Sequence, residues 1–142
     1  MCRKICRKEI IMRVLIAEDD LASRKYILKI LEPFGECDFT VNGGETLDAF
    51  LLALDELKPY DLICLDIMMP RADGMKVLKT IRQIEKQNRI EDLQRVKIIM
   101  MTALNDAETI DASYELGCEA FVTKPVDAEK LIMEIKKLKL VG

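Results

Sequence analysis

The hexapeptide LDIMMP, residues 65–70, places an acidic residue directly after an apolar run. That run, residues 61–65, has the length and composition of a strand buried on both faces. The carboxylate of Asp66 would then face the crevice beyond the carboxyl end of the strand, where open parallel α/β sheets bind ligands. The stretch therefore predicts a parallel α/β fold with Asp66 at its functional edge.

Strand-like runs alternate with segments of helical periodicity along the chain from Arg13 onward. The predicted strands cover residues 14–17, 37–41, 61–65, 96–101 and 120–122. The predicted helices carry their apolar residues over 22–31, 47–54, 75–84, 107–114 and 131–138, the last two running roughly over 106–116 and 127–140. Because only the run 37–41 alternates apolar and polar residues, it belongs at an edge. Right-handed crossovers then favour an α/β, doubly wound, five-stranded parallel sheet in the order 2-1-3-4-5, with five helices.

Local signals predict where some of these elements begin and end. Asp20 or Ser23 is expected to cap the first helix, and Gly117 to end the fourth. The tripeptide Asn-Gly-Gly at 42–44 predicts a turn before the second helix. The polar stretch 86–95 predicts an extended surface connection, which either serves a partner or is simply a longer loop.

The composition of the 142 residues limits the possible functions. We expect one domain, because 142 residues is a typical domain length, and the 50% hydrophobic and 33% charged composition allows a sizeable core with a polar surface. Its 22 basic and 25 acidic residues do not favour direct nucleic-acid binding, and no apolar stretch is long enough to span a membrane. The chain has no histidine, which excludes His-based zinc sites and Ser-His or Cys-His catalysis. Its five cysteines form no CxxC pair, so we expect reduced thiols and a cytoplasmic location.

Residues 1–11, MCRKICRKEII, form an N-terminal extension to the predicted domain 12–142. They are basic but lack the long apolar core of a secretory signal. Two interpretations stay open. The extension is a short flexible tail, or the start has been assigned too far upstream, because Met12 opens a natural-looking start and Lys8-Glu9 can be encoded by AAG-GAG, a bacterial ribosome-binding sequence.

Three other predicted strands are also followed by reactive polar residues, namely Glu18-Asp19-Asp20, Thr102 and Lys124. Taken singly, these are a solvated acidic loop, a strand-end threonine and a surface lysine. The carboxyl ends of parallel strands meet at one edge, so we expect the groups to converge on Asp66. Three carboxylates in a small space raise one another's pKa values, and a divalent cation relieves that conflict. Mg²⁺ takes oxygen ligands and keeps several waters, which suits Glu18, Asp19 and Asp66.

The same groups suit phosphoryl transfer. The Lys124 ammonium could pair with Asp66 and then with phosphoryl oxygens, and Thr102 could hydrogen-bond one of those oxygens. Positive charge around the transferred group is the main requirement of this reaction. The Asp66 carboxylate would be the nucleophile and would form an aspartyl phosphate.

Four motifs follow one another in order along the chain: VLIAEDD (14–20), LDIMMPRADG (65–74), IIMMTA (98–103) and FVTKP (121–125). Each is weak alone. Together they make the chain from Arg13 to about Leu140 resemble the receiver domain of two-component response regulators, in the single-domain style of the chemotaxis and sporulation-phosphorelay receivers. The resemblance implies the flavodoxin-like fold.

The resemblance also implies roles for the acidic residues. Asp66 falls on the phosphoacceptor position. Glu18 and Asp19 fall on the acidic pair that holds Mg²⁺ together with Asp66, with Asp19 as the direct ligand. Met68 falls where the family supplies a backbone carbonyl to the metal. The Glu-Asp pair is a common variant of Asp-Asp that keeps the charge.

The remaining positions match the switch of the family. Thr102 falls on the hydroxyl that moves onto the phosphoryl group. Lys124 falls on the phosphate-pairing lysine, and its bond to Pro125 is expected to be cis. Phe121 falls on an aromatic position that changes rotamer as Thr102 moves. This change alters the face made by the fourth helix, the fifth strand and the fifth helix.

The expected function is a stand-alone receiver that takes a phosphoryl group from a histidine kinase or a histidine phosphotransfer protein and acts on an unknown downstream protein. It would catalyse only its own phosphorylation and dephosphorylation. One alternative is a pseudo-receiver that works as a phosphorylation-independent interaction module, although all the expected site residues are present. The other is a Mg²⁺-dependent phosphohydrolase with an Asp nucleophile, although the first strand lacks its DxDxT motif.

Met68 and Leu104 stand two residues after Asp66 and Thr102, where side chains of the family flank the path of the attacking water. Both are apolar, so neither can orient a water by hydrogen bonding. We therefore expect slow self-dephosphorylation.

The predicted fourth helix is acidic and the predicted fifth helix is rich in lysine. The residues are Asp106, Glu108, Asp111 and Glu115 on the fourth, and Lys130, Lys136, Lys137 and Lys139 on the fifth. If the two helices share a face, a phosphorylation-dependent two-fold dimer could pair them reciprocally. Two solvated faces of a monomer are the alternative.

Overall fold

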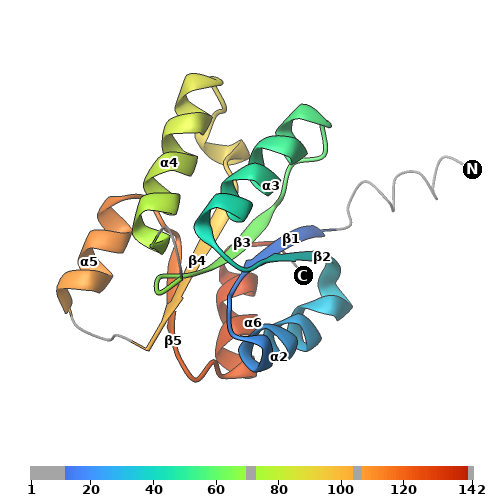
Figure 1. Cartoon of the computed structure of the whole chain (residues 1–142), viewed down its shortest axis with the longest axis vertical. Coiled ribbons are helices and arrows are strands. Elements are labelled where there is room, and N and C mark those ends of the chain that lie inside the picture. Colours follow the sequence, from blue (N-terminus) through green and yellow to red (C-terminus); the bar gives the residue numbers. More distant parts are fainter. Residues whose placement is uncertain (1–11, 70–72, 104–106, 141–142) are drawn as a thin grey trace, which may run out of the picture.

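The computed structural model describes residues 12–69, 73–103 and 107–140. Its strands form one parallel sheet in the order β2-β1-β3-β4-β5 (Figure 1). They are β1 (Met12–Ala17), β2 (Gly35–Thr40), β3 (Leu62–Asp66), β4 (Lys97–Thr102) and β5 (Ala120–Thr123). The predicted order is confirmed, and the run that alternates apolar and polar residues is the edge strand β2.

Helices cover both faces of this sheet. They are α2 (Leu21–Leu31), α3 (Gly43–Asp55), α4 (Gly74–Gln87), α5 (Ala107–Glu115) and α6 (Ala128–Lys137), with two 3₁₀ turns, η1 (Glu32–Phe34) and η2 (Asp92–Gln94). Helices α2 and α6 lie against one face, and α3, α4 and α5 against the other (Figure 1). This is the predicted doubly wound, flavodoxin-like arrangement. Across the described ranges, no helix has both the length and the apolar character that crossing a membrane requires.

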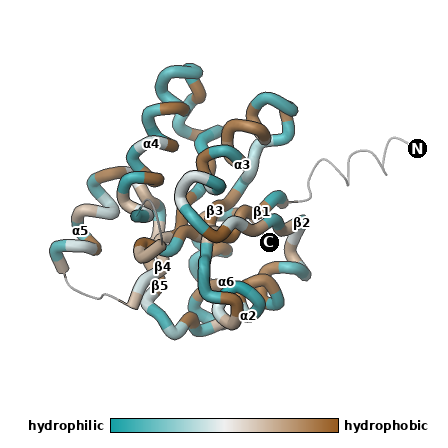
Figure 2. Tube along the Cα trace, in the orientation of Figure 1, coloured by the Kyte–Doolittle hydropathy of each residue, from teal (hydrophilic) through white to brown (hydrophobic). Residues whose placement is uncertain are grey.

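Alternate residues of the central strands point to opposite faces of the sheet and belong to two separate apolar layers. In β3, Ile63 and Leu65 pack with α3 and α4, whereas Leu62 and Cys64 pack with α2 and α6. Figure 2 shows the central strands as a largely hydrophobic band between the helices. All five residues of β3 are buried, which explains why its sequence is a continuous apolar run with a charged residue only at the end, Asp66.

One local prediction is wrong and a second holds only in part. Residues 42–44 do not form a separate turn, because Gly43 opens α3 and the Asn42 side chain caps it, accepting a bond from the Glu45 amide at 2.8 Å. Asparagine before glycine indicates a turn, but asparagine is equally favoured as a helix cap. The stretch 86–95 is mostly an exposed connection between α4 and β4, as predicted, although α4 continues to Gln87 and η2 lies within the stretch.

The helix ends mostly follow their capping signals. Asp20 rather than Ser23 caps α2, accepting a bond from the Ser23 amide at 2.8 Å. Gly117 follows α5 with φ +105°, a conformation that favours glycine at a helix end. Tyr114, the last of the apolar residues predicted over 107–114, is 47% exposed, and the smaller Ser113 is the buried residue of α5 instead. The last helix ends at Lys137, before the predicted 140.

Some predictions fall on residues outside the described ranges. These residues are the extension 1–11, Pro70, Leu104 and Asp106. What the sequence predicts for them stays a prediction.

Candidate functional site

Four strands end at one edge of the sheet, and each delivers a predicted site residue there. Asp66 and Thr102 are the last residues of β3 and β4, while Glu18 and Lys124 directly follow β1 and β5. Glu18, Asp66 and Thr102 are buried. The parallel sheet thus brings together Glu18 and Lys124, which are 106 positions apart in the chain.

The Lys124 ammonium joins two carboxylates. Its Nζ donates one bond to Asp66 Oδ2 at 3.0 Å and another to Glu18 Oε1. The Lys124 amide donates to the Thr102 carbonyl at 2.7 Å, and the Lys124–Pro125 peptide bond is cis, as expected. Burial would lower the pKa of Lys124, but the bonds to Glu18 and Asp66 raise it above its ordinary value. Lys124 is therefore a charged group held beside Asp66.

Glu18 is a carboxylate without solvent exposure. The amide of Asp20 donates to its Oε2 at 3.2 Å, and the Arg24 guanidinium donates to its backbone carbonyl at 3.2 Å. Burial raises the pKa of Glu18, the bond from Lys124 lowers it, and the neighbouring Asp66 raises it again, so that the pKa ends above its usual value. Additional positive charge at this point would stabilise the ionised form.

Glu18, Asp19 and Asp66 form the acidic group predicted to hold a cation. One carboxylate oxygen from each lies within 4.8 Å of the others. Glu18 and Asp66 are buried and Asp19 is exposed, so the group opens to solvent on one side. Mg²⁺ needs only one or two carboxylates and keeps several waters, and this donor set fits such an ion.

The two remaining predicted residues lie near these groups. The Met68 amide donates to Asp66 Oδ1 at 3.1 Å, while the Met68 side chain is 63% exposed. Phe121 is half-buried on β5, paired in register with Met100 of β4. It lies three positions before Lys124, within the edge strand β5 rather than at the carboxyl end of that strand.

A family model described as "Response regulator receiver domain" matches residues 14–136. The chain belongs to this family. This receiver domain is 32% identical over 130 residues to the transcriptional regulatory protein GlnL of Bacillus subtilis, covering 90% of the chain and 38% of GlnL. It is 34% identical over 126 residues to the probable transcriptional regulator ycf29 of Porphyra purpurea, covering 88% of the chain and 55% of ycf29. The chain thus spans about half, or less, of the length of these relatives.

Solved receiver structures share the fold. One match is a chain from the co-crystal structure of the Saccharomyces cerevisiae histidine phosphotransfer protein Ypd1 and the receiver domain of its downstream response regulator Ssk1. It has a TM-score of 0.77 and 26% identity, and the match covers 90% of this chain and 88% of that one. A CheY-like receiver domain protein from Methanospirillum hungatei has a TM-score of 0.75 and 27% identity, with 92% and 94% covered. The chain is therefore a receiver domain of two-component signalling.

Gly74 is a residue of this receiver domain that the sequence pattern alone does not single out. It opens α4, and its amide donates to the Ile67 carbonyl at 2.8 Å. A Cβ at this position would lie 2.4 Å from the Asp66 carbonyl oxygen, so only glycine fits behind the acidic residue. The available signal is a glycine after the capping residue Asp73, which many helices share. The close approach appears only in three dimensions.

Proposed function

We propose that this receiver domain accepts a phosphoryl group from a phosphohistidine onto the Asp66 carboxylate. The observation that carries the proposal is the Lys124 ammonium, bonded to both Asp66 and Glu18 at the edge where three carboxylates meet. An acceptor carboxylate needs a fixed cation that can neutralise the incoming phosphoryl oxygens. Lys124 meets that need, because its pKa is raised and it stays charged.

The transfer is a displacement at phosphorus. An oxygen of Asp66 forms the new P–O bond while the P–N bond to the donor imidazole breaks. The imidazole leaves with the electron pair of that bond and takes up a proton from solvent. Lys124 exchanges part of its bonding to the carboxylates for bonding to the phosphoryl oxygens.

Glu18, Asp19 and Asp66, with the backbone carbonyl of Met68, are the residues that would hold Mg²⁺. When bound, the ion supplies positive charge beside the phosphoryl oxygens. The acidic group has its own reason to bind a cation, because burial and the neighbouring Asp66 raise the pKa of Glu18.

Thr102 and Phe121 would couple phosphorylation of Asp66 to a conformational change in the domain. Met101 on β4 pairs in register with Asp66, and Thr102 is the next residue of β4. The Thr102 side chain therefore starts one residue along the neighbouring strand from the phosphorylated position. Phe121 lies on the next strand and is only half-buried, which leaves it room to change rotamer. Its movement would alter the face made by α5, β5 and α6, as a population shift between two states.

The proposed donor is a histidine kinase or a histidine phosphotransfer protein, the class that Ypd1 represents beside the receiver domain of Ssk1. The domain would catalyse only its own phosphorylation and dephosphorylation, and it would act through a downstream protein.

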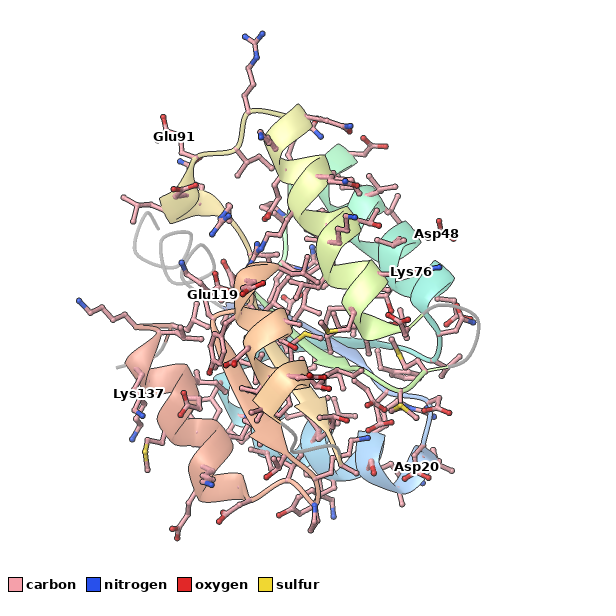
Figure 3. The ribbon with its side chains drawn as sticks, turned by 90° about the vertical axis from the view of Figure 1, so that its left-hand side faces the viewer. Asp20, Asp48, Lys76, Glu91, Glu119 and Lys137 are labelled. Atoms are coloured by element: carbon pink, nitrogen blue, oxygen red, sulfur yellow. The ribbon has the colours of Figure 1, made fainter. Side chains whose placement is uncertain are left out.

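Intact-mass spectrometry after treatment with acetyl phosphate and Mg²⁺ tests the proposal. We expect the wild type to gain one phosphoryl group and Asp66→Asn to gain none. Asp48→Asn is the matched control, because Asp48 is an exposed aspartate on α3, away from the site (Figure 3). It should be phosphorylated like the wild type, and chelation of Mg²⁺ by EDTA should stop the reaction.

Phosphorylation of the Asp66→Asn variant would show that another residue is the acceptor. If the wild type is not modified and binds no Mg²⁺, the chain is a phosphorylation-independent interaction module. Turnover of general phosphate esters would instead identify a phosphohydrolase.

A further inference from the structure

An apolar groove of about 510 Å³ lies at the opposite edge of the sheet, where β3 and β4 begin. We call it the amino-edge groove. Its lining comes from α3 and Leu57 after it, residues 59–61 before β3, Glu85 of α4, Ile90, residues 93–97 leading into β4, and Leu140. In Figure 3, Glu91, near the groove, and Asp20, beside the acidic group, lie at opposite ends of the molecule. The groove therefore lies on a surface that the phosphoryl chemistry does not use.

Two leucines on this groove are unusually exposed. Leu57 is 87% exposed and Leu93 is 91% exposed, the two highest values among the large apolar side chains in the described part of the chain. Single exposed leucines are common, but two on the walls of one apolar groove indicate a surface that something covers.

The backbone at Leu57 supports this interpretation. Its φ of +58° lies in the left-handed region, which a bulky residue rarely adopts. The amide of Lys58 reaches back to the Ala53 carbonyl at 3.0 Å, so Leu57 occupies the position after a helix where glycine is usual. A leucine kept in a strained position at the groove suggests that its side chain has a use there.

The described chain starts beside this groove, at the point where residues 1–11 join it. That N-terminal segment precedes Met12, the first residue of β1. The amide of Arg13 donates to Asp61 Oδ2 at 2.8 Å, and its guanidinium lies 4.5 Å from the centre of the Tyr60 ring. Tyr60 and Asp61 both line the groove. Eleven residues reach at most about 40 Å when extended, and only a short loop has to close for the segment to meet the groove.

The segment is basic, and acidic pairs flank the exposed leucines of the groove, whose own lining is balanced, with Asp61 and Glu85 against Arg95 and Lys97. The segment holds two basic pairs, Arg3-Lys4 and Arg7-Lys8, and a single acid, Glu9. Each exposed leucine of the groove follows a pair of exposed acids, Asp55-Glu56 before Leu57 and Glu91-Asp92 before Leu93. The segment also carries apolar side chains between its charges, at Ile5, Ile10 and Ile11. A segment with basic and apolar residues suits an apolar groove whose exposed leucines are flanked by acidic residues.

We propose that residues 1–11 cover the amino-edge groove of their own chain. The isoleucines contact Leu57 and Leu93, and the basic pairs lie beside the two acidic pairs. The stretch 86–95 then has a role, because it supplies one wall of the groove. The proposal is independent of the phosphoryl chemistry at the other edge.

Disulfide trapping in the full-length chain tests the proposal, because Cys2 and Cys6 lie within the segment. In a background carrying Cys37→Ser, Leu93→Cys is expected to form a disulfide with Cys2 or Cys6 within one chain under oxidised glutathione. The matched control is Glu36→Cys, an exposed position that pairs in register with Arg13 on the far side of β1. If residues 1–11 do not bind the groove, Cys2 and Cys6 should form a disulfide with Glu36→Cys at least as fast as with Leu93→Cys.

Two further variants separate docking from tethering. Ile10→Asp with Ile11→Asp should slow the reaction of Leu93→Cys at least about tenfold, because burying one such side chain is worth more than a factor of ten. Reversing Arg7 and Lys8 to glutamate should slow it as well, and reversing Glu91 and Asp92 to lysine in the same chain should restore it. Neither of the two changes that release the segment should slow the reaction of Glu36→Cys, because a released segment reaches that position at least as often.

Equal rates for Leu93→Cys and Glu36→Cys would overturn the proposal, since the segment would then be an unbound tail. Disulfide-linked dimers in dilute protein would also overturn it, because a second copy would be covering the groove.

Discussion

At the scale of single residues, the backbone amide and the side chain of Met68 have different roles. Its amide holds Asp66 Oδ1 at 3.1 Å, whereas its side chain is largely exposed. A thioether cannot orient an attacking water. Met68→Asn supplies an amide that can, so we expect phosphate loss from phosphorylated protein to become roughly tenfold faster, the rate equivalent of one hydrogen bond. Leu104, the second apolar residue predicted beside the water path, lies outside the described residues.

The measurement is the decay of the phosphorylated mass after rapid removal of acetyl phosphate. Met133→Asn, an exposed methionine on α6, should decay like the wild type. An unchanged rate for Met68→Asn would show that the residue does not limit water attack.

Tyr60 gives the stability a dependence on alkaline pH. Burial, and then the bond from its hydroxyl to Asp38 Oδ2 at 2.6 Å, raise the pKa of Tyr60 well above its usual value. The unfolded phenol ionises near pH 10 while the folded one stays neutral, so this contribution is fully present below about pH 10 and is lost as the pH rises above it. We expect the unfolding free energy of the wild type to fall more steeply than that of Tyr60→Phe between about pH 9 and pH 12.

Urea titrations across that pH range measure the difference. Tyr26→Phe, at an exposed position, is the control and should follow the wild type. Parallel curves for the wild type and Tyr60→Phe would contradict the assignment to this phenol.

At the scale of elements, the junction between β3 and α4 leaves no room for a side chain. A methyl group at Gly74 would meet the Asp66 carbonyl oxygen and the Ile67 backbone. We expect Gly74→Ala to lower the unfolding free energy by about 1–3 kcal/mol. Phosphorylation should also slow, because relief of the clash moves the end of β3 that carries Asp66.

Gly44→Ala is the matched control for this junction. Gly44 is also at the start of a helix, but a methyl group there meets only Asn42 Oδ1, at 3.4 Å. Alanine should be neutral or add up to about 1 kcal/mol through its helix propensity. If both variants keep wild-type stability and phosphorylation rate, the close approach at Gly74 has no energetic consequence.

At the scale of the whole molecule, α5 and α6 lie against opposite faces of the sheet but flank the same edge strand, β5 (Figure 1). Exposed acids line α5 and exposed lysines line α6, namely Glu108, Asp111 and Glu115, and Lys130, Lys136 and Lys137. A two-fold axis beside β5 would pair them reciprocally. We expect the beryllofluoride-treated domain to double its mass in light scattering at low salt and to return to monomer as salt screens the pairs.

Asp111→Lys should abolish this dimer, while Glu91→Lys, an equal change of charge at the other end of the molecule, should not. A monomer mass with and without beryllofluoride would show that the two helices present ordinary solvated faces.

Local patterns in the sequence were sufficient for the strand order and the acidic group. The alternation of apolar and polar residues in β2 predicted an edge strand, and the unbroken apolar runs of β3 and β4 predicted central strands. The reason is that a strand buried on one face alternates, whereas a strand buried on both faces is apolar throughout. Polar residues at strand ends then had to converge on Asp66, since parallel strands end at one edge. Short signals were less reliable: Asn42 caps a helix instead of forming a turn, and Tyr114 is exposed where Ser113 is buried, because neighbouring elements decide both.

Only the tertiary structure decided how the converging groups meet. The sharing of Lys124 between Glu18 and Asp66 depends on the relative positions of three strand ends, which no spacing along the chain encodes. The need for glycine at position 74 depends on how closely α4 passes behind β3. The amino-edge groove likewise exists because α3, the residues before β4 and Leu140 come together in space. The physical reason is common to all three: residue type and period set which face is buried, whereas distances between side chains from different elements follow from packing.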